Sequence, residues 1–202
     1  ADPSLWPDAH IHADKLFEKL VTHPSIKPDE VSHVCLMETH ANRMDEGSPV
    51  RVENIFREMM DTGLASPIAY LQLMRAWAHS PISEGADNAY GILSDMISAY
   101  LKDPNCMQKP EKRCFSVVME GYAKRGKADR VEQISLQLQD LYQKSRDDDF
   151  LPTAATFNSV LSAYSRCPLR DRADRAEQLL MGLRDMATLS GRPECMPDTM
   201  TV

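Results

Sequence analysis

The sequence contains few aromatic residues, which make up 6% of the chain although 43% of its residues are hydrophobic. Leu, Met, Ala and Ile supply much of the remaining apolar side-chain surface, and this mixture favours helices. No stretch reaches the roughly eighteen consecutive apolar residues that a membrane-spanning helix needs. We therefore expect a helical protein without transmembrane segments.

The chain also lacks a C-x-x-C pair. It has an odd number of cysteines, which argues for a reducing compartment and against a disulfide or zinc framework. His10 and His12 resemble a metal-binding pair, but their i, i+2 spacing points the two rings to different sides of a helix. No nucleophile with a partnered base is recognisable, so we expect no metal, no cofactor, no small-molecule substrate and no enzymatic activity. The cysteines are Cys35, Cys106, Cys114, Cys167 and Cys195.

The net charge of −7 argues against a simple nucleic-acid binder. The charge is uneven, however. Residues 1–66 hold 6 Lys/Arg against 12 Asp/Glu, whereas residues 109–130 hold 7 against 3. An acidic total can therefore contain a basic stripe.

A short motif recurs along the chain, in which a ring stands between two small residues. The rings are 37, 45 and 42 residues apart, and another ring precedes each of them by seven residues, which is two helical turns. Each pair of rings therefore shares one helix face. The pairs are His33 with His40, Tyr70 with Trp77, Phe115 with Tyr122, and Phe157 with Tyr164.

A second apolar column, with i, i+3, i+7 spacing, follows each of the four ring motifs and also occurs once before the first, and this spacing is typical of an amphipathic helix. Its first positions are Ala13, Val52, Ala89, Val131 and Ala176, and its second positions are Leu16, Ile55, Ile92, Ile134 and Leu179. A proline closes each unit, beside an Asp, Ser, Thr or Glu, and three of these four residue types are good helix caps.

These columns predict an all-α fold, a right-handed α-solenoid of helix–turn–helix repeats extending over residues 1–202. First helices are expected near 30–43, 67–79, 111–125 and 153–166, and second helices near 8–22, 50–62, 85–102, 128–145 and 172–190. A partial repeat covers residues 1–28. Full repeats cover about 29–66, 67–110, 111–152 and 153–198, and another begins at 199–202. Neither end resembles a polar cap, so we expect a piece of a longer solenoid.

The run from Gly121 to Lys127 fits G-x-x-x-x-G-K, the phosphate loop of nucleotide-binding proteins. That loop needs a preceding strand and a following Ser or Thr. Here Ala128 follows, and the upstream segment has helical periodicity. We therefore interpret the two glycines as a helix-contact residue and a turn.

The repeat resembles the pentatricopeptide repeat family. The run from Thr156 to Tyr164 matches the family's opening, Lys27-Pro28-Asp29 and Lys109-Pro110-Glu111 match its close, and the run from Tyr122 to Gly126 matches its turn. The units here are longer than usual, with extra residues in the hairpin turns and after the second helices. Tetratricopeptide repeats are the rival assignment, but they lack the Pro-Asp close.

The resemblance implies single-stranded RNA binding, with one base per repeat read by two side chains. The corresponding pairs are Val34 with Ser66, Leu71 with Glu111, Ser116 with Thr153, and Asn158 with Asp198. In the family the last of these prefers uracil. An Asn amide can hydrogen-bond a base edge, whereas Val34 and Leu71 can only wedge against a base or pack against a neighbouring helix.

Basic residues gather at two equivalent hairpin turns. If the array binds RNA, these side chains would follow the phosphates; otherwise they are ordinary solvated charges. The candidates are Lys124, Arg125, Lys127, Arg166 and Arg170.

Two functions stay open at this stage. The resemblance favours RNA binding within an organellar RNA-processing or translation factor, in a mitochondrion or plastid, with any targeting peptide outside this piece. The alternative is a protein–protein interaction scaffold that uses the concave face of the solenoid, which the acidic first half and the apolar reading positions favour.

Overall fold

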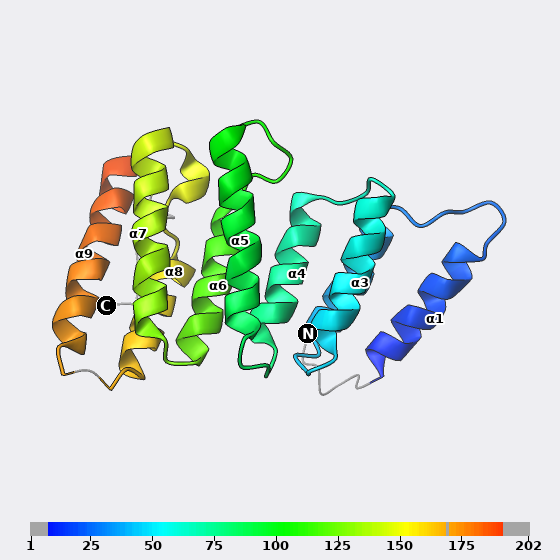
Figure 1. The fold of residues 1–202 in the computed structure, drawn as a ribbon, viewed down its shortest axis with the longest axis horizontal. Helices are drawn as coiled ribbons and strands as arrows, with labels where there is room; N and C mark the ends of the chain where they lie inside the picture. The colour runs from blue at the N-terminus through cyan, green and yellow to red at the C-terminus, as the bar shows by residue number, and fades with distance from the viewer. Residues whose placement is uncertain (1–7, 169, 192–202) are drawn as a thin grey trace. The chain divides into compact units, whose positions relative to one another are not determined.

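The computed structural model describes residues 8–168 and 170–191, and all regular secondary structure in these ranges is helical (Figure 1). The all-α prediction is confirmed. The chain divides into two compact units, Ala1–Lys109 and Pro110–Val202, called unit 1 and unit 2 below. The division coincides with an expected repeat boundary, the proline turn at residue 110.

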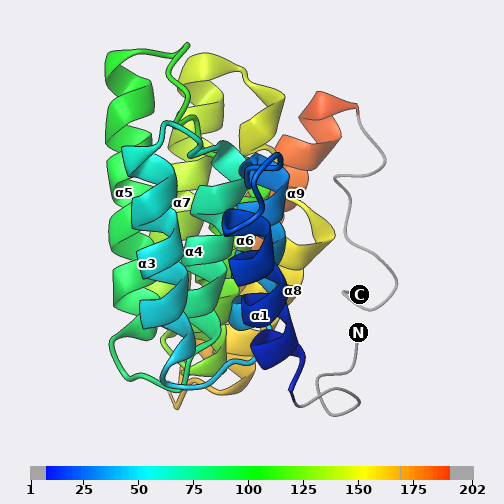
Figure 2. The same ribbon diagram turned by 90° about the vertical axis from the view of Figure 1, so that its right-hand side faces the viewer.

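Unit 1 contains five helices: α1 (Ala9–Val21), α2 (Glu30–Ala41), α3 (Ser48–Asp61), α4 (Pro67–His79) and α5 (Gly85–Lys102). Their bounds agree with the expected ranges to within two residues. Helix α2 packs against α1, α3 and α4, and α4 packs against α3 and α5. In Figure 2, α3 and α5 lie at the left, and α4 lies between them and α1. Each consecutive pair is thus a helical hairpin that stacks on the next pair.

Unit 2 contains α6 (Lys112–Lys124), α7 (Ala128–Ser145), α8 (Ala154–Ser165), α9 (Arg172–Ser190) and the short 3-10 helix η2 (Asp148–Phe150). Helices α6 and α8 lie side by side, α7 packs against both, and α9 packs against α7 and α8. The extra residues after α7 form η2, which places Phe150 in the core, with its ring 5.9 Å from that of Phe115. Within each unit, the stacked hairpins have the arrangement of a helical repeat.

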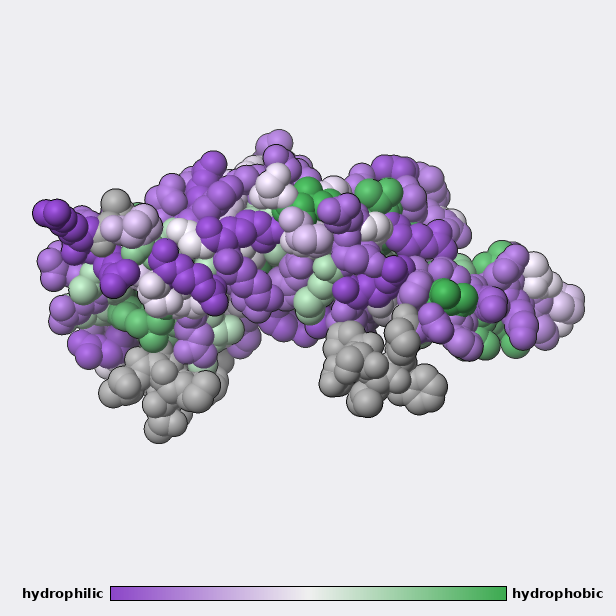
Figure 3. All heavy atoms as spheres, turned by 90° about the horizontal axis from the view of Figure 1, so that it is seen from below, coloured by the Kyte–Doolittle hydropathy of each residue, from purple (hydrophilic) through white to green (hydrophobic). Residues whose placement is uncertain are grey.

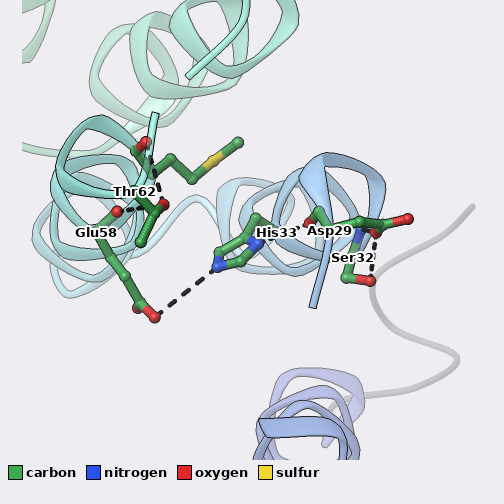
Figure 4. Close-up of polar contacts among 6 residues, drawn as sticks. Asp29, Ser32, His33, Glu58 and Thr62 are labelled. Carbon is green, nitrogen blue, oxygen red and sulfur yellow. Dashed lines mark hydrogen bonds and ion pairs between the residues drawn. The ribbon is translucent and has the colours of Figure 1, made fainter. Parts of the chain in front are cut away.

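Three residues beside the closing prolines, Asp29, Ser66 and Thr153, cap the helices that follow. The Asp29 carboxylate accepts from the Ser32 N–H at 2.8 Å, at the start of α2 (Figure 4). Ser66 caps α4 in the same way, and Thr153 forms a capping box with Thr156 on α8. Glu111 precedes α6 but pairs with Arg113 at 3.1 Å. These caps satisfy N–H groups that would otherwise have no partner in the first turn.

Six of the eight predicted rings are buried, whereas Tyr70 and Trp77 are only half-buried. Phe115, Tyr122, Phe157 and Tyr164 are all at most 3% exposed. His33 and His40 occupy the same positions in unit 1 and are equally buried. The His33 ring stacks edge-on against Phe17. Its Nε2 faces the Glu58 carboxylate at 3.8 Å (Figure 4).

His40 differs from an aromatic ring because it has a polar partner, Asp14, whose carboxylate lies 3.1 Å from its Nε2. Arg51 binds the same carboxylate at 2.7 Å. Burial outweighs these contacts and lowers the pKa of His40. Because the neutral ring is favoured, this histidine serves as a core residue with one anchored nitrogen.

The second apolar column is mostly buried, although Ile92 is only partly buried and the column is exposed at its beginning. Ile55, Ile134 and Leu179 are at most 7% exposed, whereas Leu16 on α1 is 66% exposed. The expectation that Leu16 packs like its equivalents is therefore wrong. Among the described helices, α1 packs on α2, and its other faces carry exposed apolar side chains. These appear as green patches among hydrophilic residues at the right of Figure 3. None of the described helices is long and apolar enough to cross a membrane.

Candidate nucleic-acid interface

A groove of about 340 Å³ runs between α6 and α8. Two rows of residues with i, i+4 spacing line it, one on each helix, because residues four apart lie on one face of a helix. The row on α6 is Ser116, Glu120 and Lys124; the row on α8 is Asn158, Ser162 and Arg166. Four of the six residues, namely Ser116, Lys124, Asn158 and Arg166, are binding candidates from the sequence.

The predicted pair of Ser116 and Thr153 lies together at one end of this groove. Their hydroxyl oxygens are 3.4 Å apart, and the Ser116 hydroxyl also donates to the carbonyl of Lys112. Thr153 has a structural duty as well, since its oxygen accepts from the N–H of Thr156. Ser116 is therefore the more adaptable member of the pair toward a ligand.

Asn158 lies on α8 as a groove-lining, half-buried residue. Its amide group carries both donors and acceptors, so the groove has a side chain that can read a base edge. Asp198, its predicted partner, lies outside the described residues.

Two cations stand on the walls of the groove. Lys124 pairs with Glu120 at 3.1 Å, and both side chains are nearly half exposed. Arg166 donates to the Ser162 hydroxyl at 3.1 Å and, across the helix pair, to the carbonyl of Ala123 at 3.0 Å. Arg166 is therefore held in place, whereas the exposed Lys124 pair is weak and easily exchanged for another anion.

The other cationic candidates lie outside the lining of this groove. Arg125 donates to the carbonyl of Gly121 at 2.9 Å, and Lys127 lies 5.8 Å from the centre of the Tyr122 ring. Arg170 is exposed in the turn before α9. The turn at Gly126, whose φ is +66°, follows a helix and not a strand, which agrees with the interpretation of the glycine motif as a turn.

The candidates of unit 1 have packing roles. Val34 packs against the core between α2, α3 and α4, and Leu71 is 8% exposed. Ser66 caps α4. Glu111 belongs to unit 2, where it pairs with Arg113. The polar lining seen between α6 and α8 thus has no counterpart at Val34 and Leu71.

Sequence reasoning missed Glu120 and Ser162. Both stand at the middle of their rows, one turn from a candidate on either side. The i, i+4 spacing from Ser116 to Lys124, and from Asn158 to Arg166, is the signal that would have found them.

A polar network holds α8 from another side. The Tyr164 hydroxyl donates to the Glu132 carboxylate at 2.7 Å, and Arg175 binds the same carboxylate. Tyr164 follows Ser162 by two residues, so it points roughly 200° around the helix from the groove row. Burial, and then the hydrogen bond to Glu132, raise the pKa of Tyr164 to about 12. The network links α7, α8 and α9.

No known protein-family model matches this chain. Among curated proteins, the chain is similar to a chloroplastic pentatricopeptide repeat-containing protein of Arabidopsis thaliana. The two are 25% identical over 189 residues, which are 93% of this chain. The chain spans 33% of the length of that relative.

Proposed function

We propose that this chain binds single-stranded RNA and that the groove between α6 and α8 is a contact site. The observation that carries the proposal is the convergence of two rows on one groove, one with the Ser116 hydroxyl and one with the Asn158 amide, each ending in a cation. Ser116 and Asn158 stand at positions that the pentatricopeptide resemblance assigns to base reading, and Lys124 and Arg166 belong to the basic turns. The similar chloroplast protein supports the same family assignment.

The two ends of the groove differ in chemistry. Asn158 and Ser116 can form hydrogen bonds with a base, because an amide and a hydroxyl both donate and accept. Lys124 and Arg166 are positively charged and only donate hydrogen bonds, so they suit the anionic phosphate oxygens of the backbone. Arg125, Lys127 and Arg170 extend this cationic function along the turns. A base at Asn158, with uracil preferred as the resemblance implies, would place its phosphate toward the cationic end.

The cellular setting is part of the proposal. We propose that the protein is an organellar RNA-processing or translation factor of a plastid or mitochondrion. The name of the similar protein describes that protein as chloroplastic, which supports this setting.

Filter binding to uracil-rich and adenine-rich oligonucleotides at two salt concentrations tests the function. Lys124→Glu should weaken binding to both oligonucleotides alike, because a phosphate contact carries no sequence information. The control is Lys144→Glu on α7, which breaks a similar exposed i, i+4 pair, with Asp140, at a position outside the groove lining. Both variants change the net charge equally.

Asn158→Ala should instead remove the preference for uracil and leave the salt dependence unchanged, since it deletes base-edge hydrogen bonds only. A folded chain without salt-sensitive RNA binding at tens of micromolar protein contradicts the proposal. So does equal weakening by Lys124→Glu and Lys144→Glu, because that result would reflect net charge and not this groove.

A further inference from the structure

A second groove, of about 580 Å³, lies in unit 1 among α3, α4 and α5. Leu73 and Trp77 from α4 line it, with Phe56 from α3 and Ile92 from α5. Glu53 adds a carboxylate from α3. The volume is within the range of roughly 300–1,000 Å³ that ligand pockets occupy. This α3–α4–α5 groove shares no lining residue with the groove between α6 and α8.

In unit 2, helices α7, α8 and α9 correspond to α3, α4 and α5 of unit 1, and a polar network joins them. Arg175 of α9 reaches the Glu132 carboxylate of α7, and Tyr164 of α8 donates to it. In unit 2 the chain itself therefore provides the arginine, Arg175, that pairs with this carboxylate.

The repeat register gives the unit 1 equivalents of these three residues. Glu53 follows Val52 as Glu132 follows Val131, Trp77 is the ring that matches Tyr164, and Asn88 precedes Ala89 as Arg175 precedes Ala176. Unit 1 therefore has a carboxylate and a ring at these positions, as unit 2 does, but an uncharged side chain stands where unit 2 has the arginine. Glu53, Trp77 and Asn88 all line the groove.

Gly91 lines this groove and leaves open space over the backbone of α5. It stands in the middle of α5, where glycine costs about 1 kcal/mol relative to alanine. A Cβ added there would meet no atom within 4 Å, so packing within the described chain does not require glycine. A residue without a side chain permits close approach of an outside backbone.

The charge of unit 1 selects the partner. Its 109 residues hold 9 Lys/Arg against 16 Asp/Glu. In the groove, Glu53 pairs with Arg57 at 3.1 Å, and the Arg57 side chain is 63% exposed. Such exposed i, i+4 pairs contribute only about 0.3–0.5 kcal/mol, so an incoming cation can replace Arg57 at the carboxylate. Asp87 adds a second carboxylate to the lining.

We propose that the α3–α4–α5 groove binds an arginine of a basic, extended segment of a partner protein. The guanidinium takes the place that Arg175 occupies in unit 2, pairing with Glu53 and stacking on the indole of Trp77. The backbone of the segment passes over Gly91. Arginine is favoured over lysine because its planar group forms two parallel hydrogen bonds with a carboxylate and stacks on aromatic faces.

Trp77 fluorescence reports binding directly. The chain has two tryptophans, so the Trp6→Phe variant leaves Trp77 as the single emitter. The probe is a blocked pentapeptide with an arginine on each side of a central leucine, compared with its lysine counterpart at physiological salt. We expect a saturable change in Trp77 emission, with the arginine peptide binding several-fold more tightly.

Asn88→Arg in this background is the decisive variant, because it restores within unit 1 the arginine that unit 2 has. We expect it to weaken the arginine peptide by about tenfold or more. Without peptide, the Trp77 emission of the Asn88→Arg variant should resemble that of the Trp6→Phe protein saturated with the arginine peptide. The matched control is Asn105→Arg, which adds the same charge to unit 1 in the loop after α5, at a position outside the groove lining.

Three results overturn the proposal. The first is the absence of saturable binding by the arginine peptide. The second is equal weakening by Asn88→Arg and Asn105→Arg, which would indicate general charge attraction. The third is a change in Trp77 emission with protein concentration when no peptide is present. That change would mean that a second copy of the chain fills the groove. RNA binding by α6 and α8 is measured separately, so either proposal can fail alone.

Discussion

Replacement of Glu132 by alanine removes the acceptor that joins α7, α8 and α9. Tyr164 is 3% exposed, so its hydroxyl would lose a partner that water cannot easily replace. A buried polar group left without its hydrogen bond costs about 1–3 kcal/mol. The lost pair with Arg175 adds at most about 1 kcal/mol, since both side chains are about one-third exposed. Alanine returns a few tenths of a kcal/mol through helix propensity. We expect Glu132→Ala to lower the free energy of unfolding by about 2–3 kcal/mol.

Urea denaturation followed by the helical circular dichroism signal measures this loss. Glu177→Ala is the matched control, because it makes the same substitution at an exposed position of α9 and should change stability by less than about 0.5 kcal/mol. In a Tyr164→Phe background, Glu132→Ala should cost less, since no hydroxyl is left without an acceptor. If Glu132→Ala is as stable as Glu177→Ala, the network does not hold the three helices together and the reasoning is refuted.

Three further measurements test the packing. Ala163→Leu should destabilise the chain by about 1–3 kcal/mol, because Ala163 is fully buried and added methylenes overpack the contact; an unchanged denaturation midpoint would contradict the repeat alignment. Gly91→Ala should stabilise α5 by about 0.5–1 kcal/mol in the same assay, since its Cβ meets no neighbour, and a loss of stability would mean that unit 1 needs glycine there. The folded pKa of Tyr164, about 12, is above its ordinary value of 10.0, so its contribution to stability is complete below pH 10 and is lost as the pH rises toward 12. Denaturation at pH 9 and pH 12 should therefore show a stability loss of about 2 kcal/mol more in the wild type than in Tyr164→Phe, and equal losses would count against the shift.

The helices could be predicted from the sequence because each one combines an apolar column with a capped start. Thr153 and Thr156 show this locally, since cap and helix are three residues apart. Contacts between residues that are far apart in the sequence leave no local pattern of this kind. Tyr164 and Glu132 are 32 residues apart, and no short motif announces their hydrogen bond. The exposure of Leu16 could not be predicted either, because periodicity defines the apolar face of a helix but not whether another helix covers it.

The candidate site was predictable in part for the same reason. Asn158 and Ser116 directly follow the rings Phe157 and Phe115 in the repeat, and this register fixes the face of the helix on which they lie. Their grouping into one groove depends on α6 and α8 packing side by side, which is a tertiary fact. Val34 and Leu71 occupy the same register but carry apolar side chains, and the structure places them against the core. The repeat therefore fixes where each position lies in the fold, and the side chain at that position determines whether it packs or can bind a ligand.

The same distinction accounts for the different surfaces of the two units. Units 1 and 2 share one repeat register, yet residues 1–109 carry 9 Lys/Arg against 16 Asp/Glu, whereas residues 110–202 carry 14 of each. Phosphate binding needs cations at a groove, and unit 2 supplies them at Lys124 and Arg166. Unit 1 has Glu53 and a tryptophan where unit 2 joins its helices through an arginine. A solenoid keeps its fold when such positions change, because each repeat is stabilised mainly by its neighbours in the stack. Different repeats of one array are therefore free to take different partners, and a neutral unit that follows an acidic one in the sequence is the charge pattern expected if RNA binds the first and a basic protein segment binds the second.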